Sequence, residues 1–219
     1  MITKRQENIL EVLVRDYINS AQPISSEFLE KKHKFGLSPA TLRIEMQKLT
    51  DGGYLIQPHT SAGRVPTDRG YRFFVDKIME ERLEEWEKDF EADWQNIHRI
   101  TRMLAEESSN LVLGYLPEEG MLWKDGWNKI FHEPEFLEAG FDLKLAELIN
   151  DFEENIKDAI SPEVRVYIGR ENPFSKIQDF SIITSGVLTI LGPKRMDYKK
   201  NISLLKSATK YGKRKRGIK

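Results

Sequence analysis

The feature that most constrains the fold is residues 38–71, where a capped helical segment is followed by a short strand and a loop of small residues. Ser38 can cap a helix, and Pro39 suits its first position because the missing N–H has no intrahelical partner there. Gly52 and Gly53 then end the helix. A helix, a short strand and a small-residue loop that carries an arginine predict a winged helix-turn-helix.

Two further helices precede this one. Thr3 and Gln6 have the spacing of a capping box, and apolar residues then recur at helical spacing. A proline ends that helix, and Ser25 or Ser26 caps the next one. We therefore predict a DNA-binding domain over residues 1–77.

The third helix has two chemically different faces. Leu42, Met46 and Leu49 share one side and should pack on the first two helices. The opposite side can read base edges, because arginine suits guanine, glutamine suits adenine, and small or apolar groups meet thymine methyls. Ordinary solvated surface is the alternative, since such residues are common on exposed helix faces. The predicted DNA contacts of this helix are Ser38 and Thr41 at its start, near a phosphate, and Ala40, Arg43, Ile44 and Gln47 on its face.

The wing is predicted from residues 54–64. Residues 54–57 form a short strand, a proline ends its hydrogen-bonding register, and small residues allow close approach to another polymer. Arg64 would reach phosphates or a narrow minor groove. A lone loop histidine is more often a plain surface residue, yet it completes the predicted wing contacts, which are His59, Thr60 and Ser61.

Two stretches of this region match a known family. Residues 38–43 read Ser-Pro-Ala-Thr-Leu-Arg, and residues 57–73 read Gln-Pro-His-Thr-Ser-Ala-Gly-Arg-Val-Pro-Thr-Asp-Arg-Gly-Tyr-Arg-Phe. Both resemble the heat-inducible transcription repressor family, HrcA. Residues 167–172 and 192–198 resemble the ends of that family's GAF-like domain. The resemblance implies a cytoplasmic homodimer that represses chaperone operons by binding an inverted repeat in double-stranded DNA, in family members with help from the chaperonin.

Three features depart from the family pattern. Ile44 stands where the family usually carries Asn, which replaces an adenine-reading amide with an apolar contact. The middle of the chain is much shorter than usual, so most of the inserted dimerising domain is expected to be missing. Only three residues connect the two expected strands between Ile183 and Val187, where family members usually have a longer connection. The dimer geometry and any effector site are therefore left open.

Helical periodicity continues from Tyr71 to about Leu116, and we predict a connecting and dimerisation helix over residues 78–116. Apolar residues recur every seven positions, with a second position half filled. We favour a contact with a second copy, because a reader of inverted repeats needs two-fold symmetry. An ordinary connector packed in its own domain is the alternative. The predicted dimerisation residues are Leu83, Trp86, Phe90, Ile97, Ile100 and Leu104.

Residues 117–219 predict a reduced GAF-like α+β domain with a basic C-terminal tail. A helix is expected over residues 137–160, a strand over 164–168, and a β-hairpin about Ser185 and Gly186. The fold class is therefore α+β, with an N-terminal winged helix-turn-helix, a long connecting helix and this reduced domain.

Charge is distributed unevenly, although the net charge is −1. Lys and Arg minus Asp and Glu give 12 − 9 = +3 for residues 1–79, 8 − 22 = −14 for 80–158 and 14 − 4 = +10 for 159–219. The acidic middle should face away from phosphate. The basic tail, residues 210–219, either attracts phosphate nonspecifically or only aids solubility.

Catalysis is not expected. The chain has no cysteine, and no helix carries two of its four histidines at metal-binding spacing. No Gly-rich phosphate loop precedes a helix. Turn chemistry and ion pairing explain residues 169–172 and 192–195 better than a ligand site does. We therefore expect no catalytic residue, no cofactor and no metal, and a cytoplasmic protein without a membrane segment.

The residues are compatible with two functions. The first is a sequence-specific DNA-binding repressor that uses the third helix and the wing. The alternative is a protein-interaction adaptor that has lost specific DNA binding. The presence of Arg43, Thr60, Ser61 and Arg64 favours the repressor.

Overall fold

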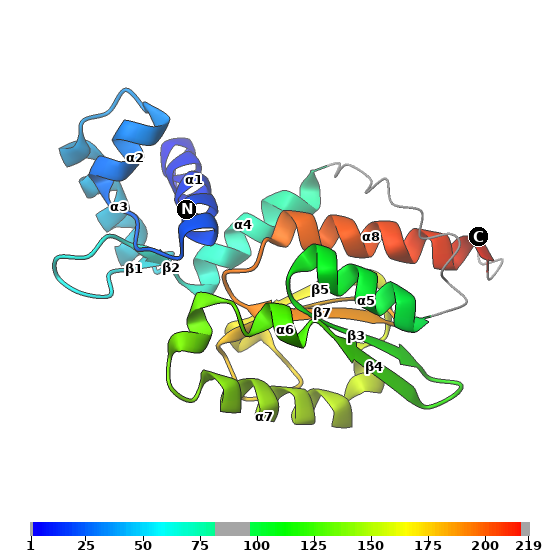
Figure 1. Cartoon of the computed structure of the whole chain (residues 1–219). Helices are drawn as coiled ribbons and strands as arrows, with labels where there is room; N and C mark the ends of the chain where they lie inside the picture. The colour runs from blue at the N-terminus through cyan, green and yellow to red at the C-terminus, as the bar shows by residue number, and fades with distance from the viewer. Residues whose placement is uncertain (1, 82–96, 216–219) are drawn as a thin grey trace. The chain divides into compact units, whose positions relative to one another are not determined.

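The computed structural model describes residues 2–81 and 97–215, with side chains through Thr209. The chain forms two compact units, Met1–Glu80 and Glu81–Lys219. Figure 1 shows the helices and strands of both units.

Unit 1 holds three short helices, a two-stranded wing and a fourth helix. The capping box of Thr3 and Gln6 is present at the first helix, as the sequence predicts. Ser25 rather than Ser26 caps the second helix, because its side chain accepts a hydrogen bond from the N–H of Phe28. The elements are α1 (Lys4–Ser20), α2 (Ser26–His33), α3 (Pro39–Asp51), β1 (Leu55–Ile56), β2 (Val65–Pro66) and α4 (Asp68–Glu80).

The core of unit 1 places α3 in one orientation. Leu42, Met46 and Leu49 are at most 3% exposed, which confirms the predicted inward face of α3. Ile9 and Leu13 of α1 and Leu29 of α2 belong to the same buried apolar set. Burying an apolar side chain of this size stabilises a fold by roughly 1.5–3 kcal/mol. The opposite face of α3 is consequently fixed toward solvent.

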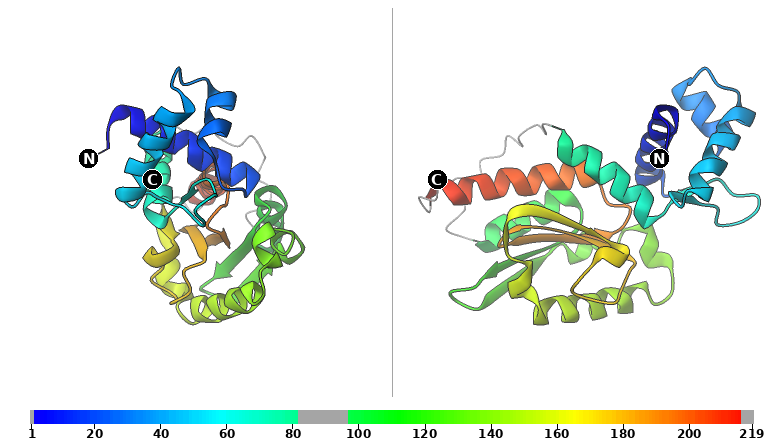
Figure 2. Two further views of the ribbon diagram at one scale, coloured as in Figure 1. Left: turned by 90° about the vertical axis from the view of Figure 1, so that its left-hand side faces the viewer. Right: turned by 180° about the vertical axis from the view of Figure 1, so that it is seen from behind.

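Unit 2 is built on a five-stranded antiparallel sheet with the strand order β4-β3-β7-β6-β5. Helix α7 lies on one face of this sheet, and α5 and α8 lie on the other (Figure 2). The strands are β3 (Leu111–Leu116), β4 (Met121–Asp125), β5 (Ser161–Ile168), β6 (Phe180–Gly186) and β7 (Leu188–Pro193). The helices are α5 (Ile97–Ser108), α6 (Trp127–Ile130), α7 (Phe141–Glu154) and α8 (Tyr198–Lys215), with short 3-10 turns at Pro134–Leu137, Ile156–Ala159 and Gly169–Glu171.

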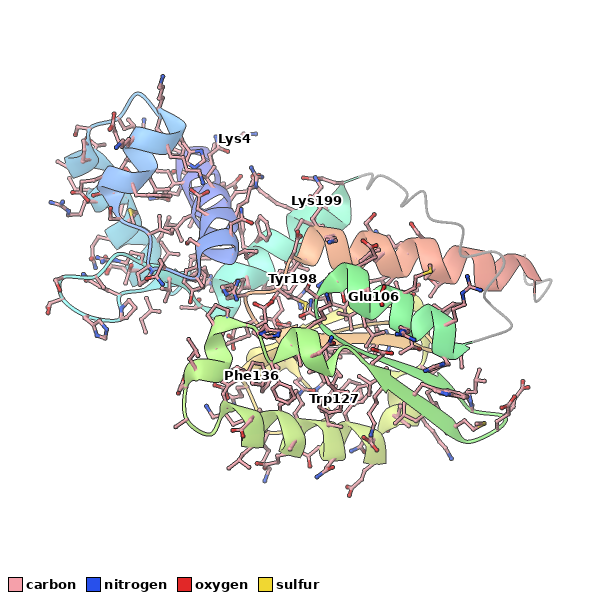
Figure 3. All side chains as sticks on the ribbon, viewed as in Figure 1. Lys4, Glu106, Trp127, Phe136, Tyr198 and Lys199 are labelled. Carbon is pink, nitrogen blue, oxygen red and sulfur yellow. The ribbon has the colours of Figure 1, made fainter. Side chains whose placement is uncertain are left out.

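Each face of the sheet has its own contacts. On the α7 side, Leu145, Leu148 and Phe152 are fully buried in an apolar core. Figure 3 labels Phe136, which precedes α7 in the chain. Its ring meets the ring of Phe141, at the start of α7, edge to face with a centroid distance of 4.9 Å. On the other side the contacts include polar pairs between α8 and β6, Tyr198 with Ser181 at 2.7 Å and Thr209 with Ser185 at 3.1 Å.

The predicted helix over residues 78–116 is wrong at its C-terminal end. Residues 111–116 form β3, which pairs with β4 and β7. Ser109 takes a left-handed conformation after α5, with φ of 56°, and ends the helix. Leu83, Trp86 and Phe90 lie outside the described residues.

The other three predicted dimerisation residues belong to the core of unit 2. Ile97 is 5% exposed, and Ile100 and Leu104 are fully buried. Helix α5 packs on β3, where Gly114 leaves room for Thr101 and Ile97. A seven-residue repeat cannot distinguish a contact with a second copy from a contact with the chain's own sheet. These side chains are therefore not a surface for a second copy.

The predicted β-hairpin is confirmed. Strands β6 and β7 pair from Phe180 with Pro193 to Ser185 with Leu188. Gly186 has φ of 58°, a left-handed conformation that glycine adopts without strain. The expected helix over 137–160 is shorter, since α7 ends at Glu154 and a 3-10 turn follows.

Candidate nucleic-acid interface

The outward face of α3 carries the predicted base-reading residues. Ala40, Arg43, Ile44 and Gln47 are all exposed, and the Ile44 side chain is 58% accessible to solvent. An apolar side chain this exposed is accessible to an apolar group such as a thymine methyl. The structure thus brings these four residues together on one surface.

Arg43 forms an ion pair with a residue of α2. Its Nη2 lies 2.5 Å from Oε1 of Glu27, and the two side chains are 66% and 58% exposed. The pKa of Glu27 is lowered first by a hydrogen bond from its own backbone N–H, then by the hydroxyls of Ser25 and Ser26 and the charge of Arg43, with desolvation opposing. Sequence reasoning missed Glu27, although an acidic residue in the first turn of a helix is a recognisable signal.

Gln47 is engaged at both ends of its side-chain amide. Its Oε1 accepts a hydrogen bond of 2.9 Å from Arg64, and its Nε2 donates one of 2.8 Å to Asp51. The amide has two N–H donors and two oxygen lone pairs, so one position at each end stays open. Gln47 is therefore exposed, and its two partners within the protein restrain its orientation.

The side chain of Arg64 is engaged within unit 1, which does not favour the predicted phosphate contact. Its side chain is only 8% exposed, and Nε donates to Oγ1 of Thr50 at 3.1 Å while Nη2 donates to Gln47. Both interactions connect the wing to the outward end of α3. Arg64 is a positioning residue of the wing, because a buried guanidinium needs fixed acceptors and finds them on α3.

A second connection holds the base of the wing. The backbones of Ile24 and Arg64 exchange two hydrogen bonds of 3.0 and 2.8 Å, which form an isolated antiparallel bridge. A Cβ atom on Gly63 would lie 2.4 Å from the carbonyl carbon and oxygen of Ile24. Glycine is required here because the two backbones approach so closely.

The tip of the wing is organised by one side chain. Nε2 of Gln57 donates to the carbonyl oxygens of Thr60 and Ala62 at 2.8 and 3.0 Å. His59, Thr60 and Ser61 remain exposed at the tip. The structure therefore leaves these three predicted wing contacts accessible.

The start of α3 is capped within the protein. Oγ of exposed Ser38 accepts a hydrogen bond from the N–H of Thr41 at 3.1 Å and lies 3.0 Å from the Thr41 hydroxyl. Pro39 offers no N–H. Any phosphate at this end would have to use the hydroxyls and the remaining amides of the first turn.

Together these elements surround an open groove of about 550 Å³. The start of α2, the outward face of α3 and the wing each form one wall. Residues of every wall line it, including Ser25, Glu27, Arg43, Gln47, Thr60 and Arg64.

Unit 2 offers no comparable anion site at residues 192–195. The guanidinium of Arg195 is held by Glu133 at 2.5 Å and Glu135 at 2.8 Å, and its side chain is 11% exposed. Burial alone would lower the pKa of Arg195, but hydrogen bonds and charges from these two glutamates outweigh burial and raise it. Arg195 therefore forms structural ion pairs with these glutamates, which agrees with the expectation of ion pairing rather than a ligand site.

Within residues 2–81 and 97–215, no three His, Asp or Glu side chains come together as a metal site. No helix among these same residues is long and apolar enough to span a membrane.

The comparison with known proteins decides the family. The model described as "HrcA protein C terminal domain" matches residues 68–202, which is more than half of the chain. The chain belongs to the HrcA family. This membership and the observed sheet confirm the expected GAF-like α+β class.

Curated HrcA relatives match the chain in two ways. The "Heat-inducible transcription repressor HrcA" of Thermoanaerobacter pseudethanolicus is 27% identical over 325 aligned positions, which cover 94% of both chains. Since 325 positions exceed the 219 residues of this chain, the relative has residues that this chain lacks. The relative of the same name from Desulforamulus reducens is 40% identical over 124 residues, 52% of this chain and 36% of that protein. Such local matches span about a third or less of the first relatives.

One solved structure shares the overall architecture. It is titled "Crystal structure of a hypothetical protein at 2.2 A resolution", with a TM-score of 0.79, 19% identity, and coverage of 96% of this chain and 98% of that one. This similarity supports the fold of the HrcA chain and carries no functional information.

Proposed function

We propose that this chain is a sequence-specific DNA-binding repressor of heat-shock and chaperone operons, which binds an inverted-repeat operator as a homodimer. The observation that carries the proposal is the outward face of α3, where exposed Arg43 and Ile44 lie above a buried apolar face that fixes the orientation of the helix. The names of the HrcA relatives, heat-inducible transcription repressors, support the same function.

The proposed contacts divide into base readers and backbone contacts. Arg43 donates to a guanine edge and Ile44 packs on a thymine methyl in the major groove. Ser38 and Thr41 at the start of α3 and His59, Thr60 and Ser61 at the wing tip lie along the sugar-phosphate backbone. Ala40 is small enough to let α3 enter the groove closely, and Arg64 holds the wing in place without touching DNA.

The two-fold symmetry of an inverted repeat requires a dimer. We place the dimer contact on the stretch that includes Leu83, Trp86 and Phe90, since Ile97, Ile100 and Leu104 are buried within unit 2. The cytoplasm as location and the chaperonin as partner are supported by the family resemblance alone.

Selection from a pool of randomised duplexes tests this function without assuming an operator. The purified chain should enrich an inverted repeat whose half-sites lie on one face of the duplex, about 10 base pairs or a multiple apart. Enrichment of no common sequence would contradict sequence-specific binding and favour the adaptor.

A further inference from the structure

We propose that Glu27 is a specificity-determining residue, which orients Arg43 toward a base edge and weakens binding to non-matching duplexes. This inference rests on the proposed DNA-binding function. It concerns how the protein rejects wrong sequences rather than how it binds the right one.

The geometry places Glu27 directly beside the arginine that reads bases. Glu27 lies in the first turn of α2 and Arg43 in the second turn of α3, so the ion pair of 2.5 Å crosses the groove between these helices. More than half of each side chain is exposed. DNA that reaches Arg43 therefore also comes close to the carboxylate.

Glu27 carries its negative charge independently of Arg43. Hydrogen bonds from its own N–H and from Ser25 and Ser26 lower its pKa, and the Arg43 charge is the smallest of the causes. These groups are at the start of α2, where a helix ordinarily offers donors to a phosphate. The carboxylate takes the place of that phosphate, so any DNA strand meets a negative charge there.

The ion pair uses only part of the arginine. Nη2 contacts Glu27, and Nη1 and Nε of Arg43 have no other hydrogen-bond acceptor within the described residues. A side chain held at one nitrogen loses less rotamer freedom when its free edge binds a base. The same contact keeps the guanidinium from turning to phosphates, which carry no sequence information.

Gln47 increases the dependence on this pair. Arg64 and Asp51 each occupy one hydrogen-bonding position of its amide and restrain its orientation, so Gln47 has less freedom to adapt to a base. Arg43, which among the described residues is held at one nitrogen only, is the more adaptable hydrogen-bonding residue on the α3 face. A matched guanine binds the free edge of Arg43 while the pair with Glu27 persists, whereas on a mismatched duplex the same pair keeps Arg43 from gaining a phosphate contact instead.

Substitution of Glu27 by glutamine, Glu27→Gln, tests the inference with a matched control. Glu30→Gln removes the same charge one turn along α2, and Glu30 has no ion pair in the described part of the chain. Fluorescence anisotropy of the full chain should be measured with an inverted-repeat duplex from a chaperone promoter and with its scrambled version, at several salt concentrations. Thermal unfolding checks that each variant folds.

We expect Glu27→Gln to tighten binding to the scrambled duplex and to lower the ratio of the two Kd values about tenfold. Glu30→Gln should strengthen both complexes equally and leave the ratio unchanged. In an Arg43→Ala background, Glu27→Gln should no longer change the ratio, because the pair is already lost.

A Glu27→Gln protein that keeps the wild-type ratio would overturn the role of Glu27 while leaving the DNA-binding function intact. The role of Glu27 would also be overturned if Glu30→Gln lowered the ratio of the two Kd values by the same factor. That result would show that the loss of any negative charge on α2 has this effect. If the wild-type chain binds the two duplexes with equal affinity, sequence-specific DNA binding is contradicted. The proposed role of Glu27, which rests on that function, is then contradicted as well.

Discussion

Nη2 of Arg64 donates a 2.9 Å hydrogen bond to Oε1 of Gln47, and this contact ties the base of the wing to the outward face of α3. The two residues that a sequence pattern assigns separately to backbone and base contacts are thus partners of each other. Their interaction fixes where the wing tip lies relative to the reading helix.

Arg64→Ala should act on stability and on the wing rather than on phosphate attraction. Removing the guanidinium leaves Thr50 and Gln47 without their donor, and we expect a loss of about 1–3 kcal/mol in the free energy of unfolding. The slope of log Kd against log salt should stay unchanged, because no phosphate contact is removed. Urea unfolding and salt-dependent anisotropy measure both quantities.

The control for Arg64→Ala is Arg15→Ala on α1. Arg15 is 55% exposed and, among the residues that the structure describes, pairs across one helical turn with Glu11, so its loss should cost less than about 1 kcal/mol. If Arg64→Ala leaves stability intact and reduces the salt slope by about one unit, Arg64 contacts phosphate after all.

Gly63→Ala should separate the wing from the segment before α2. The new methyl would overlap the Ile24 carbonyl, and such overpacking typically costs about 1–3 kcal/mol. Hydrogen exchange should show lost protection at the amides of Ile24 and Arg64, which form the bridge. Ser61→Ala, at the exposed tip, should leave that protection unchanged. Equal protection in Gly63→Ala would show that the close approach is absent in solution.

Arg43→Ala should relax sequence preference with little effect on folding. The side chain is exposed, so its removal creates no cavity, and loss of a base contact costs ~1–3 kcal/mol at the matched position. Competition binding with duplexes that vary one base pair at a time reveals which position loses its preference. A uniform loss of affinity across all duplexes would instead identify Arg43 as a phosphate contact.

Leu104→Ala should destabilise unit 2 and leave self-association unchanged. Leu104 is a fully buried residue of α5, and truncation of such a leucine costs about 2–5 kcal/mol. Sedimentation at a temperature where the variant is folded should give the wild-type dimer dissociation constant. Weaker association together with an unchanged free energy of unfolding would show that Leu104 lies in the dimer contact.

Local chemistry made much of unit 1 predictable from the sequence. The caps of Thr3 and Ser38 depend on residues three positions apart, and the inward face of α3 follows from helical periodicity. The partners of Arg64 could not be predicted, since Gln47 lies 17 residues away and only the fold brings them together. Arginine in a small-residue loop fits both a DNA contact and an internal anchor.

The same limitation explains the error in unit 2. Ile97, Ile100 and Leu104 have helical spacing, and the α5 helix does form. Periodicity indicates which face is buried but not what covers it, and here the sheet covers it. The strand at 111–116 escaped prediction because it is apolar on both faces and so lacks the alternation of a half-buried strand.

The most direct test of the central claim is fluorescence anisotropy with an intact inverted-repeat duplex, a single half-site and a scrambled duplex at physiological salt. The account predicts that the intact repeat binds at least ~10³-fold more tightly than the scrambled duplex, with two chains per duplex. Equal affinity for all three duplexes would contradict the account, because the exposed face of α3 would then read no sequence.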